Sequence, residues 1–321
     1  MMQPNAQSIS VILPTFRRPD FLNLCLQSLA SQTTPPSEVL VSVTLDDIES
    51  RKTALAWEDK LPIQLVEPIG RGVIGAMNSC LDISQGTYVL LVDDDVELPP
   101  TWVEQMLAHL FSDPNIVGAG GRDLLLDHPE FRANEKRLAH VGIVEPWGRI
   151  VGNHHRGAPP ARRVRILRGS NCLYRGDFLR RVRFDEDLRG KGAQVHWELS
   201  LAFAVWQAGL SLFYDPTVEV LHHVAPRHDG DGNHRGIFDP EGIYDMTFNE
   251  VLIVLRHAPL GIRERCLCWN FLVGSVTCPG LLQIPRLIVE RSPHLFKRAL
   301  AAWRGRFAAL AAALNARRVG V

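Results

Sequence analysis

The sequence predicts an α/β protein with a doubly wound, mostly parallel sheet. Short apolar runs that stop at breaker or charged residues alternate with longer stretches whose apolar side chains recur at helical spacing. Three of the apolar runs lead directly into hydroxyl, basic or acidic residues. Because the carboxyl ends of parallel strands share one edge of an open sheet, this pattern predicts a polar site at that edge.

The first 120 residues contain this alternation in order. Residues 9–13 form an apolar run that Pro14 stops, and Pro19 then suits the first position of a helix in which leucines recur every three or four residues. The other elements expected here are strands at 39–45, 63–66, 88–92 and 116–119, and helices at about 70–86 and 101–111. Their order favours right-handed crossovers between parallel strands.

The stretch from Tyr88 to Glu97 is the centre of the prediction. Its apolar strand runs into three consecutive carboxylates, Asp93, Asp94 and Asp95. Side chains alternate on extended backbone, so Asp93 and Asp95 can point one way while Asp94 points another. Divalent cations such as Mg²⁺ take oxygen ligands, often one or two carboxylates together with substrate phosphates. The alternative is a solvated acidic turn, because aspartate is common in turns.

The composition indicates a folded chain without an overall charge bias. The chain has 321 residues, and 46% of them are hydrophobic, which supports a substantial core. Lysine plus arginine and aspartate plus glutamate both number 35, so no overall basic field favours nucleic acid as a partner. The six cysteines form no C-x-x-C pair, which argues against zinc and fits a reducing compartment. Since no apolar signal region follows the first methionine, we expect a cytoplasmic location.

Residues after 120 add further polar positions. Residues 141–152 predict a hairpin around Pro-Trp-Gly, and residues 197–209 predict a helix with an apolar stripe and a terminal glycine. Two short strands are expected within residues 211–221, and they lead into His222 and His223. These two histidines therefore lie at a strand end, as the aspartates do.

The chain changes character near residue 241, and we expect a helical, apolar and basic extension over residues 241–321. The run 266–284 has no charge but is broken by Pro-Gly, and seven basic residues but no acid follow Glu290. Broken apolar helices with a basic tail favour peripheral contact of residues 260–321 with the inner face of the cell membrane. The alternatives are a helix packed on the preceding domain or a contact in a homo-oligomer. Just before the extension, residues 227–239 predict a loop that orders over a ligand.

Several motifs together resemble the inverting family 2 glycosyltransferases of GT-A fold. The motifs are residues 10–18 (SVILPTFRR), the Asp46-Asp47 pair after the second strand, residues 91–95 (LVDDD), residues 168–175 (RGSNCLYR) and residues 184–188 (FDEDL). The resemblance covers about residues 8–225. It implies a nucleotide-sugar glycosyltransferase domain over residues 1–240, followed by the helical extension.

The resemblance also implies roles for single residues. Asp93 and Asp95 would hold a divalent cation, Mn²⁺ or Mg²⁺, on the donor diphosphate. The histidine that completes such a site in many relatives falls best on His223, with His222 second. The nucleotide side would comprise Pro14, Thr15, Arg18, Asp46 or Asp47, Arg71, Asn78 and Asp94. The family commonly has Asp-Asp-Gly-Ser or Asp-Asn-Gly-Ser where this chain has DDIES, so the choice between Asp46 and Asp47 is open.

Glu198 is the residue that the resemblance implies as catalytic base. Family members commonly carry Glu-Asp at the start of this helix, and counting back from Gly209 places Trp197-Glu198 at that position. His196 is the second candidate, because free imidazole titrates near neutrality. The structural alternative is that Glu198 is an acid in a first helical turn, where the helix dipole favours it.

The function implied is metal-dependent, inverting transfer of a sugar from a nucleotide-diphosphate sugar to a hydroxyl of a glycan or glycolipid acceptor. Synthesis of a cell-surface polysaccharide or glycolipid would use such a reaction. Two rival classes remain open. A catalytically impaired, membrane-associated scaffold is favoured by the missing Glu-Asp pair. A nucleotidyltransferase would need a glycine-rich basic loop after the first strand, where this chain has Pro-Thr-Phe.

Overall fold

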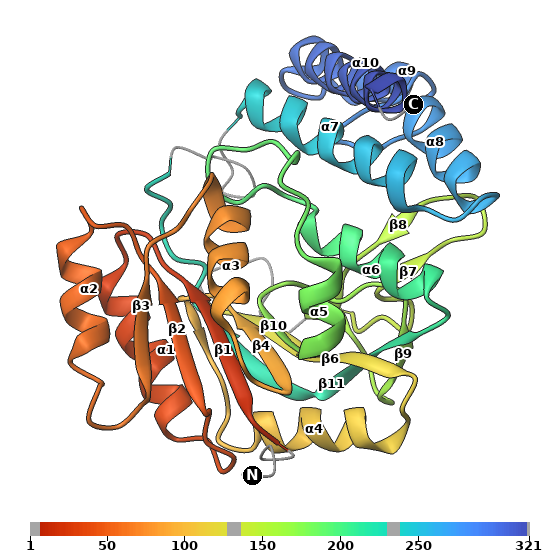
Figure 1. Ribbon diagram of the computed structural model, residues 1–321. Coiled ribbons are helices and arrows are strands. Elements are labelled where there is room, and N and C mark those ends of the chain that lie inside the picture. The colour runs from red at the N-terminus through yellow and green to blue at the C-terminus, as the bar shows by residue number, and fades with distance from the viewer. Residues whose placement is uncertain (1–6, 127–135, 230–237, 320–321) are drawn as a thin grey trace.

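The computed structural model describes residues 7–126, 136–229 and 238–319, which Figure 1 shows in their arrangement. The main sheet of these residues has nine strands in the order β3-β2-β1-β4-β10-β6-β11-β5, with β9 paired to β11. The strands are β1 (Ile9–Pro14), β2 (Glu38–Ser42), β3 (Ile63–Val66), β4 (Tyr88–Val92), β5 (Val96–Glu97), β6 (Ile116–Leu125), β9 (Arg162–Val164), β10 (Asn171–Arg175) and β11 (Ser211–His222). The half from β3 to β4 is parallel, whereas β10 runs antiparallel between β4 and β6.

Helices cover both faces of this sheet. Their bounds are α1 (Pro19–Ala30), α2 (Ile48–Leu55), α3 (Gly72–Ile83), α4 (Trp102–Ser112), α5 (Gly176–Val182), α6 (Trp197–Gln207), α7 (Pro240–His257), α8 (Ile262–Leu272), α9 (Gln283–Val289) and α10 (Leu295–Val319). Buried side chains of α1 and α4 join one apolar cluster, and those of α3, α5, α6 and α7 join another. The predicted α/β fold class is therefore confirmed.

Strand β4 illustrates how the sequence produces these layers. All five of its residues are buried. Val89 and Leu91 belong to the cluster beneath α3 and α6, while Tyr88, Leu90 and Val92 belong to the cluster beneath α1 and α4. Side chains alternate between the two faces of a strand, so a continuous apolar run is what a strand covered on both sides requires. The acidic residues begin where this burial ends.

Two segments differ from the expectations drawn from the sequence. Strand β2 ends at Ser42, three residues before the expected end, and helix α2 follows. The sequence did not predict α2 because only Ser50 and Ala54 of this helix are buried, so it has no apolar stripe. The two short strands expected at 211–221 are a single strand, β11, whose pairing with β6 shifts register between Asp215 and Glu219. Such a bulge lets one strand continue across a break in its alternation.

The middle of the chain contains the predicted hairpin, formed by β7 (Ile143–Val144) and β8 (Ile150–Val151). Arg265 of α8 donates from Nη1 to the carbonyl of Pro146 at 2.9 Å. The tip of the hairpin therefore rests on the C-terminal helices. Figure 1 shows it beside α8 and across from α6. Of the predicted ligand loop at 227–239, residues 230–237 lie outside the described residues.

The C-terminal helices pack on the sheet domain through α7. Val251, Leu252 and Val254 are fully buried, and they share one apolar cluster with residues of α6. Helix α10 lies along the far side of α7, as Figure 1 shows. The division of the chain near residue 240 stays a prediction, because the core continues across it. No helix among the described residues is both long enough and apolar enough to span a membrane.

Candidate active site

The carboxylates after β4 lie where three strands come together. The backbone N–H of Asp93 donates to the carbonyl of Ser170, just before β10, at 3.2 Å. The backbone carbonyl of Asp95 accepts from the N–H of His223, just after β11, at 2.9 Å. A side-chain oxygen of Asp95 accepts from the N–H of Ala225 at 2.9 Å. The polar ends of β4, β10 and β11 therefore form one edge, as the sequence predicts.

Asp93, Asp95 and His222 form a compact group at this edge. One oxygen or nitrogen atom from each lies within 4.8 Å of the others. Nε2 of His222 is 3.4 Å from Asp95, and its Nδ1 is 3.3 Å from Asp123. Two carboxylates and an imidazole suit Mn²⁺, and the carboxylates suit Mg²⁺. These residues therefore fit a divalent cation.

The geometry favours His222 over His223 as the candidate third ligand. Its Nε2 lies 2.5 Å from Glu97, and its ring packs near Phe21 at 5.8 Å between centroids. His222 is the last residue of β11 and is paired with Val96, so its side chain points to the carboxylates while the next residue points to the other side. His222, the second candidate, lies beside Asp93 and Asp95 instead.

Asp123 contacts the ring nitrogen of His222 that faces away from Asp95. It is fully buried on β6 and also accepts hydrogen bonds from Ser170 Oγ at 2.5 Å and Asn171 Nδ2 at 3.1 Å. Burial alone would raise the pKa of Asp123, but the charge of Arg168 and the hydrogen bond with His222 hold this pKa below its usual value. An ionised carboxylate behind an imidazole fixes the orientation of the ring, which is a common arrangement behind metal-ligating histidines.

Asp94 faces the loop after β1 instead of the neighbouring carboxylates. Its two oxygens accept from Thr15 Oγ1 at 2.8 Å and from Arg18 Nη1 at 2.9 Å. The same guanidinium nitrogen of Arg18 is 3.5 Å from Asp95, and its Nε donates to the carbonyl of Pro226. Asp94 thus ties the predicted nucleotide loop to the acidic turn. Arg18 balances part of the acidic charge.

The acidic turn is costly to ionise without a cation. Burial, followed by the nearby charge of Asp95, raises the pKa of Asp93 to about 6. Burial also raises the pKa of Asp94 to about 6, although Arg18 opposes this rise. Desolvation and like charges both disfavour the ionised carboxylate. Neighbouring buried carboxylates with raised pKa values, such as Asp93 and Asp94, are a feature of functional sites more often than of stable cores.

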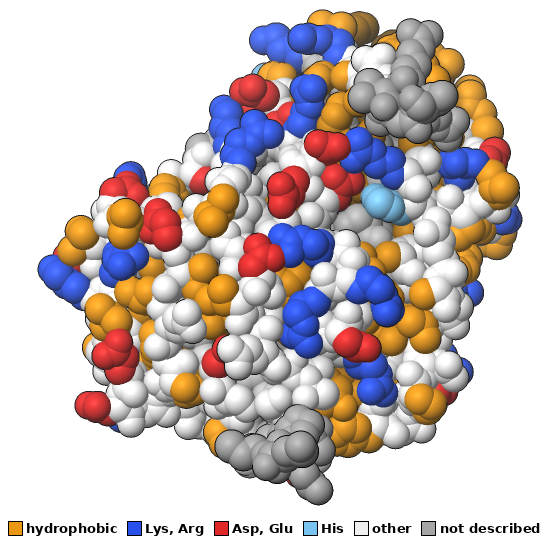
Figure 2. Space-filling model, in the orientation of Figure 1, with side chains coloured by type: hydrophobic (Ala, Val, Ile, Leu, Met, Phe, Trp, Pro, Cys, Tyr) orange, Lys and Arg blue, Asp and Glu red, His pale blue; other side chains and the backbone are white. Residues whose placement is uncertain are grey.

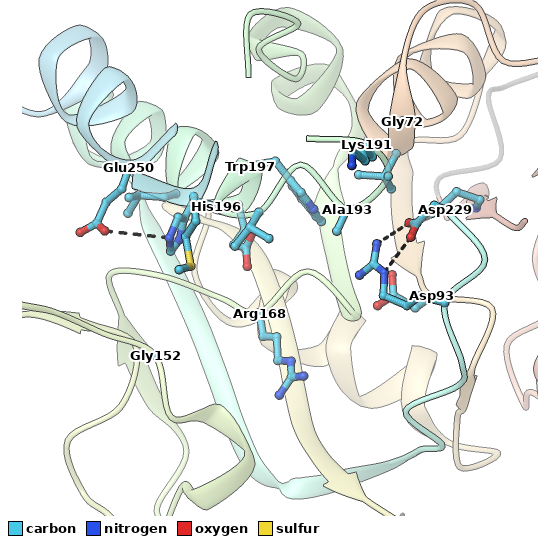
Figure 3. Close-up of a pocket in the computed structure, with 18 of the residues that line it drawn as sticks. Gly72, Asp93, Gly152, Arg168, Lys191, Ala193, His196, Trp197, Asp229 and Glu250 are labelled. Atoms are coloured by element: carbon cyan, nitrogen blue, oxygen red, sulfur yellow. Dashed lines mark hydrogen bonds and ion pairs between the residues drawn. The ribbon is translucent and has the colours of Figure 1, made fainter. Parts of the chain in front are cut away.

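A cavity of about 1110 Å³ extends from this edge toward the C-terminal helices. Figure 3 shows Asp93 and Lys191 at one end, His196 and Glu250 at the other, and Arg168 between them. Its volume exceeds the range of about 300–1,000 Å³ typical of single small-molecule sites. The cavity therefore has room for two ligands. Its lining includes these candidate residues: Pro14, Thr15, Arg18, Asp93, Asp94, Asp95, Glu198 and His222.

Glu198 lies in the first turn of α6 and lines this cavity. Trp197 before it is buried, packing edge-on against Phe184 and over Gly169, where a Cβ would come within 2.1 Å of the indole. The tryptophan therefore packs into the core, and both Trp197 and Glu198 line the cavity. His196 has a left-handed backbone, with φ of 79°, and its Nε2 is 3.9 Å from Glu250.

Asp46 and Asp47 have different environments. Asp47 is buried, caps α2 by accepting from the N–H of Ser50 at 3.3 Å, and accepts from the N–H of Arg17 at 2.5 Å. Asp46 is exposed and pairs with the Arg17 side chain at 3.0 Å. Neither is among the residues that line the cavity. Asp47 is engaged by backbone groups, whereas Asp46 is exposed and held only by the Arg17 side chain.

The comparisons with known proteins agree with this geometry. The model of the family described as glycosyl transferase family 2 matches residues 10–183, more than half of the chain. The chain belongs to glycosyl transferase family 2. A validoxylamine A glucosyltransferase of Streptomyces hygroscopicus is 32% identical over 153 residues, 43% of this chain and 34% of that protein. A glucosyl-dolichyl phosphate glucuronosyltransferase of Haloferax volcanii is 24% identical over 67% of this chain and 68% of its own.

Solved structures show the same fold over nearly the whole chain. TarS residues 1–349 of S. aureus, in complex with UDP, have a TM-score of 0.57 at 15% identity and cover 98% of this chain and 92% of that one. The mannosyltransferase PcManGT of Pyrobaculum calidifontis, in complex with GDP-Man and Mn²⁺, has a TM-score of 0.54 at 17% identity, covering 96% and 86%. The fold is therefore GT-A. In sequence, the chain spans about a third of the length of several curated relatives.

Two residues carried over from the family pattern lie away from this cavity. Arg71 precedes α3 and lines a separate cavity with Glu186 and Arg189. Asn78 is buried, and its amide bonds the backbone N–H and carbonyl of Phe184 and the side chain of Glu186, all within 3.1 Å. These hydrogen bonds hold the 184–186 turn to α3, so the structure gives Asn78 a structural role, and its nucleotide-side assignment stays a prediction.

If that role is structural alone, Asn78→Ala should weaken the fold without weakening nucleotide binding. Alanine would leave the N–H and carbonyl of Phe184 unpaired in the core, at a cost of about 2–4 kcal/mol in the free energy of unfolding. Urea unfolding measures this cost, and calorimetric titration with nucleotide checks the affinity. Asn23→Ala, which removes an exposed acceptor of Trp57, is the matched control. If Asn78→Ala lost nucleotide affinity but kept the stability of the wild type, Asn78 would be a nucleotide-binding residue after all.

His154 should make the protein sensitive to mild acid. It is buried in the cavity wall, its Nε2 is 2.8 Å from the carbonyl of Ile166, and burial lowers its pKa to about 4. Between that pKa and its ordinary value of 6.5, the unfolded chain binds a proton that the folded chain does not. The free energy of unfolding should consequently fall as pH decreases through this window.

His154→Gln should remove about 1–3 kcal/mol of that pH dependence while keeping a donor for Ile166. Urea unfolding at about pH 7 and about pH 4.5 compares the two proteins. His140→Gln, at an exposed position, controls for the loss of a histidine as such. If the free energy of unfolding of His154→Gln changed with pH as much as that of the wild type, the lowered pKa of His154 would be contradicted.

The structure adds cavity residues that reasoning from sequence missed. Arg168 lies beside Asp123, Lys191 lies opposite the acidic turn, and Arg227 pairs with Asp229 at the rim. Arg168 is the first residue of the segment 168–175 that resembles a family motif, so its position was recoverable. The C-terminal residues Trp269 and Thr277 also line the cavity, and no pattern in the sequence connects them to the aspartates.

Proposed function

We propose that this family 2 protein catalyses metal-dependent, inverting transfer of a sugar from a nucleotide-diphosphate sugar to a hydroxyl of a glycan or glycolipid. The main observation behind this proposal is that Asp93, Asp95 and His222 lie together in a large cavity that Glu198 also lines. Relatives bound to UDP or GDP-Man share the fold and support a nucleotide-sugar donor. We further propose that the enzyme acts in the cytoplasm, at the inner face of the cell membrane.

In this proposal the two ends of the cavity have different tasks. Asp93, Asp95 and His222 would hold Mn²⁺ or Mg²⁺, which when bound would offset the charge of the departing diphosphate. Asp123 orients His222. Arg18 and Lys191 would bind diphosphate oxygens by charge-assisted hydrogen bonds. The loop of Pro14 and Thr15, with the exposed Asp46, would contact the nucleoside.

Glu198 would act as general base on the acceptor. Its carboxylate would take the proton of the acceptor hydroxyl as that oxygen bonds to the anomeric carbon. The bond from the anomeric carbon to the diphosphate oxygen breaks at the same time, and the diphosphate leaves with the electron pair. A single displacement of this kind inverts the configuration at the anomeric carbon. His196 is retained as the second candidate.

The two alternatives are less well supported. Family membership argues against a nucleotidyltransferase. The impaired-scaffold alternative rests on Trp197 in place of an acid, but Glu198 beside it still lines the cavity. Association as a homo-oligomer stays a prediction.

A donor panel tests the proposal. UDP-, GDP- and dTDP-sugars are incubated with the protein with and without Mn²⁺ or Mg²⁺, and both nucleotide release and thermal shift are measured. The proposal predicts a response to one nucleotide, and only when the cation is present. A panel with no response to any nucleotide would support the scaffold alternative.

A further inference from the structure

Helix α10 carries an apolar face that the rest of the protein does not cover. Phe296 is 76% exposed, Leu300 62%, Phe307 57% and Leu314 60%, and the partly exposed Trp303 lies among them. Their spacing of i, i+4, i+7, i+11 and i+18 places all five on one side of the helix. We call these five residues the apolar face.

The opposite side of α10 holds the helix on the protein. Ala301, Ala302 and Ala309 are buried there, and Gly305 packs against α7 so closely that a Cβ would lie 2.4 Å from the carbonyl of Tyr244. Small side chains therefore attach α10 to α7. The large apolar side chains of the apolar face contribute little to this attachment, so their exposure calls for another explanation.

The apolar face continues onto neighbouring elements. Phe271 of α8 contacts Trp303 at 5.5 Å and Phe307 at 6.1 Å between ring centroids. The backbone of Leu281 donates to the carbonyl of Phe271, and Leu281 is 54% exposed. Further exposed apolar residues on this part of the chain are Leu272, Val276, Leu282, Ile288 and Val289. Eleven of the nineteen large exposed apolar residues in the described chain lie between Leu260 and Leu314.

Basic side chains flank this surface. Lys297 and Arg304 are exposed on α10 beside the apolar face, and Arg286 and Arg291 are exposed in and after α9. Between residues 265 and 315 the sequence contains one acid, Glu290, which pairs with Arg286 at 2.8 Å. Figure 2 shows basic and apolar side chains together at the upper end of the molecule, over the helices that Figure 1 labels α9 and α10.

We propose that the apolar face and its basic flanks dock on an anionic lipid surface, with α10 lying in the membrane plane. An interfacial helix buries its apolar side in the acyl boundary and places lysine and arginine against lipid phosphates. A second copy of this chain would bring like charges together around the apolar contact, and the one acid between residues 265 and 315, Glu290, is already paired with Arg286. Charge complementarity therefore selects anionic lipid as the occupant.

Docking in this way would place one wall of the cavity near the membrane. Ser275 and Thr277 line the cavity, while Val276 between them is 48% exposed. Leu272 and Leu282, joined by a backbone hydrogen bond, are exposed beside this turn. The turn after α8 therefore links the lipid-facing surface to the wall of the cavity. An acceptor held in the membrane could reach the cavity by this side.

Vesicle binding by the full chain tests the inference. Flotation with phosphatidylcholine vesicles is compared with flotation using vesicles that contain about 30% phosphatidylglycerol, in about 0.1 M and about 0.5 M salt. We expect binding to the anionic vesicles only, weakened by the higher salt. The variant Phe296→Ser/Leu300→Ser should lower the partition coefficient at least about tenfold. Lys297→Gln/Arg304→Gln should lower binding to anionic vesicles and remove its salt dependence.

The matched control is Ile83→Ser/Phe111→Ser, which removes two exposed apolar side chains from α3 and α4. It should bind as the wild type does. Equal binding by the Phe296→Ser/Leu300→Ser variant, or no wild-type binding to either vesicle, would overturn the inference. The inference would also fail if the wild type did not bind vesicles but self-associated, and if the Phe296→Ser/Leu300→Ser variant abolished that self-association. The inference rests on the membrane location proposed above but not on sugar transfer, because the assay contains neither donor nor acceptor.

Discussion

Glu198→Gln should lower the rate of sugar transfer by a factor of about 10² to 10⁴ while leaving donor affinity nearly unchanged. Glutamine keeps the size of the side chain but cannot accept the proton of the acceptor hydroxyl. The loss should therefore fall on kcat and not on donor binding. Single-turnover nucleotide release measures the chemical step, and calorimetric titration of the intact protein with the nucleotide diphosphate measures the binding.

Two variants separate this result from its alternatives. Glu49→Gln removes an exposed acid from the first turn of α2, together with its ion pair to Lys52, so it measures what such a carboxylate contributes to stability, about 0.3–1 kcal/mol. His196→Asn tests the second candidate base and suits the left-handed backbone at that position. The base assignment fails if His196→Asn loses transfer and Glu198→Gln does not. It also fails if Glu198→Gln loses donor binding and transfer equally.

Asp95→Asn and Asp93→Asn should each abolish binding of the divalent cation and reduce transfer to background. Each variant removes one of two carboxylates from a three-residue group, and the amide oxygen that remains is neutral. Mn²⁺ binding followed by electron paramagnetic resonance, without any nucleotide, gives a readout that does not depend on activity. Asp59→Asn, an exposed carboxylate before β3, is the control and should bind Mn²⁺ as the wild type does.

Asp93→Asn should also stabilise the metal-free protein at neutral or higher pH. The folded-state pKa of Asp93 is raised to about 6, so the unfolded chain ionises this group more readily and the wild type loses stability as pH rises toward 6. The variant should unfold at a higher temperature than the wild type at about pH 8, and the difference should shrink toward pH 4. If Asp93→Asn were less stable than the wild type at about pH 8, the carboxylate of Asp93 would stabilise the fold itself. That result would contradict the view that Asp93 serves metal binding at a cost in stability.

The edge of the sheet was predictable because strand ends are marked in the sequence. The apolar run Tyr88–Val92 stops at the first aspartate, and Pro14 stops β1, so both sets of polar residues were placed correctly at one edge. The choice between His222 and His223 was not predictable in the same way. It depends on the phase of alternation in β11. The sequence marks a break near Asp215, but it does not show how the register shift between Asp215 and Glu219 changes that phase.

Contacts between distant segments account for the rest. Asn78 looks like a site residue because it lies on the helix after the third strand. Its amide instead faces Phe184, more than a hundred residues away in sequence. Asp123 lies beyond the strand expected at 116–119, and its importance comes only from its contacts with His222 and Ser170 in space. The hydrophobic pattern of the C-terminal helices predicts helices, but not that Trp269 and Thr277 complete the cavity wall.

The anomeric configuration of the first-formed product tests the central claim most directly. Once the donor panel has identified the sugar nucleotide, proton nuclear magnetic resonance can follow the wild type with donor, cation and acceptor, or with water as acceptor, before the anomers equilibrate. A single displacement with Glu198 as base predicts a product whose anomeric configuration is opposite to that of the donor. A product that keeps the donor configuration would contradict this mechanism and require a covalent or front-face path.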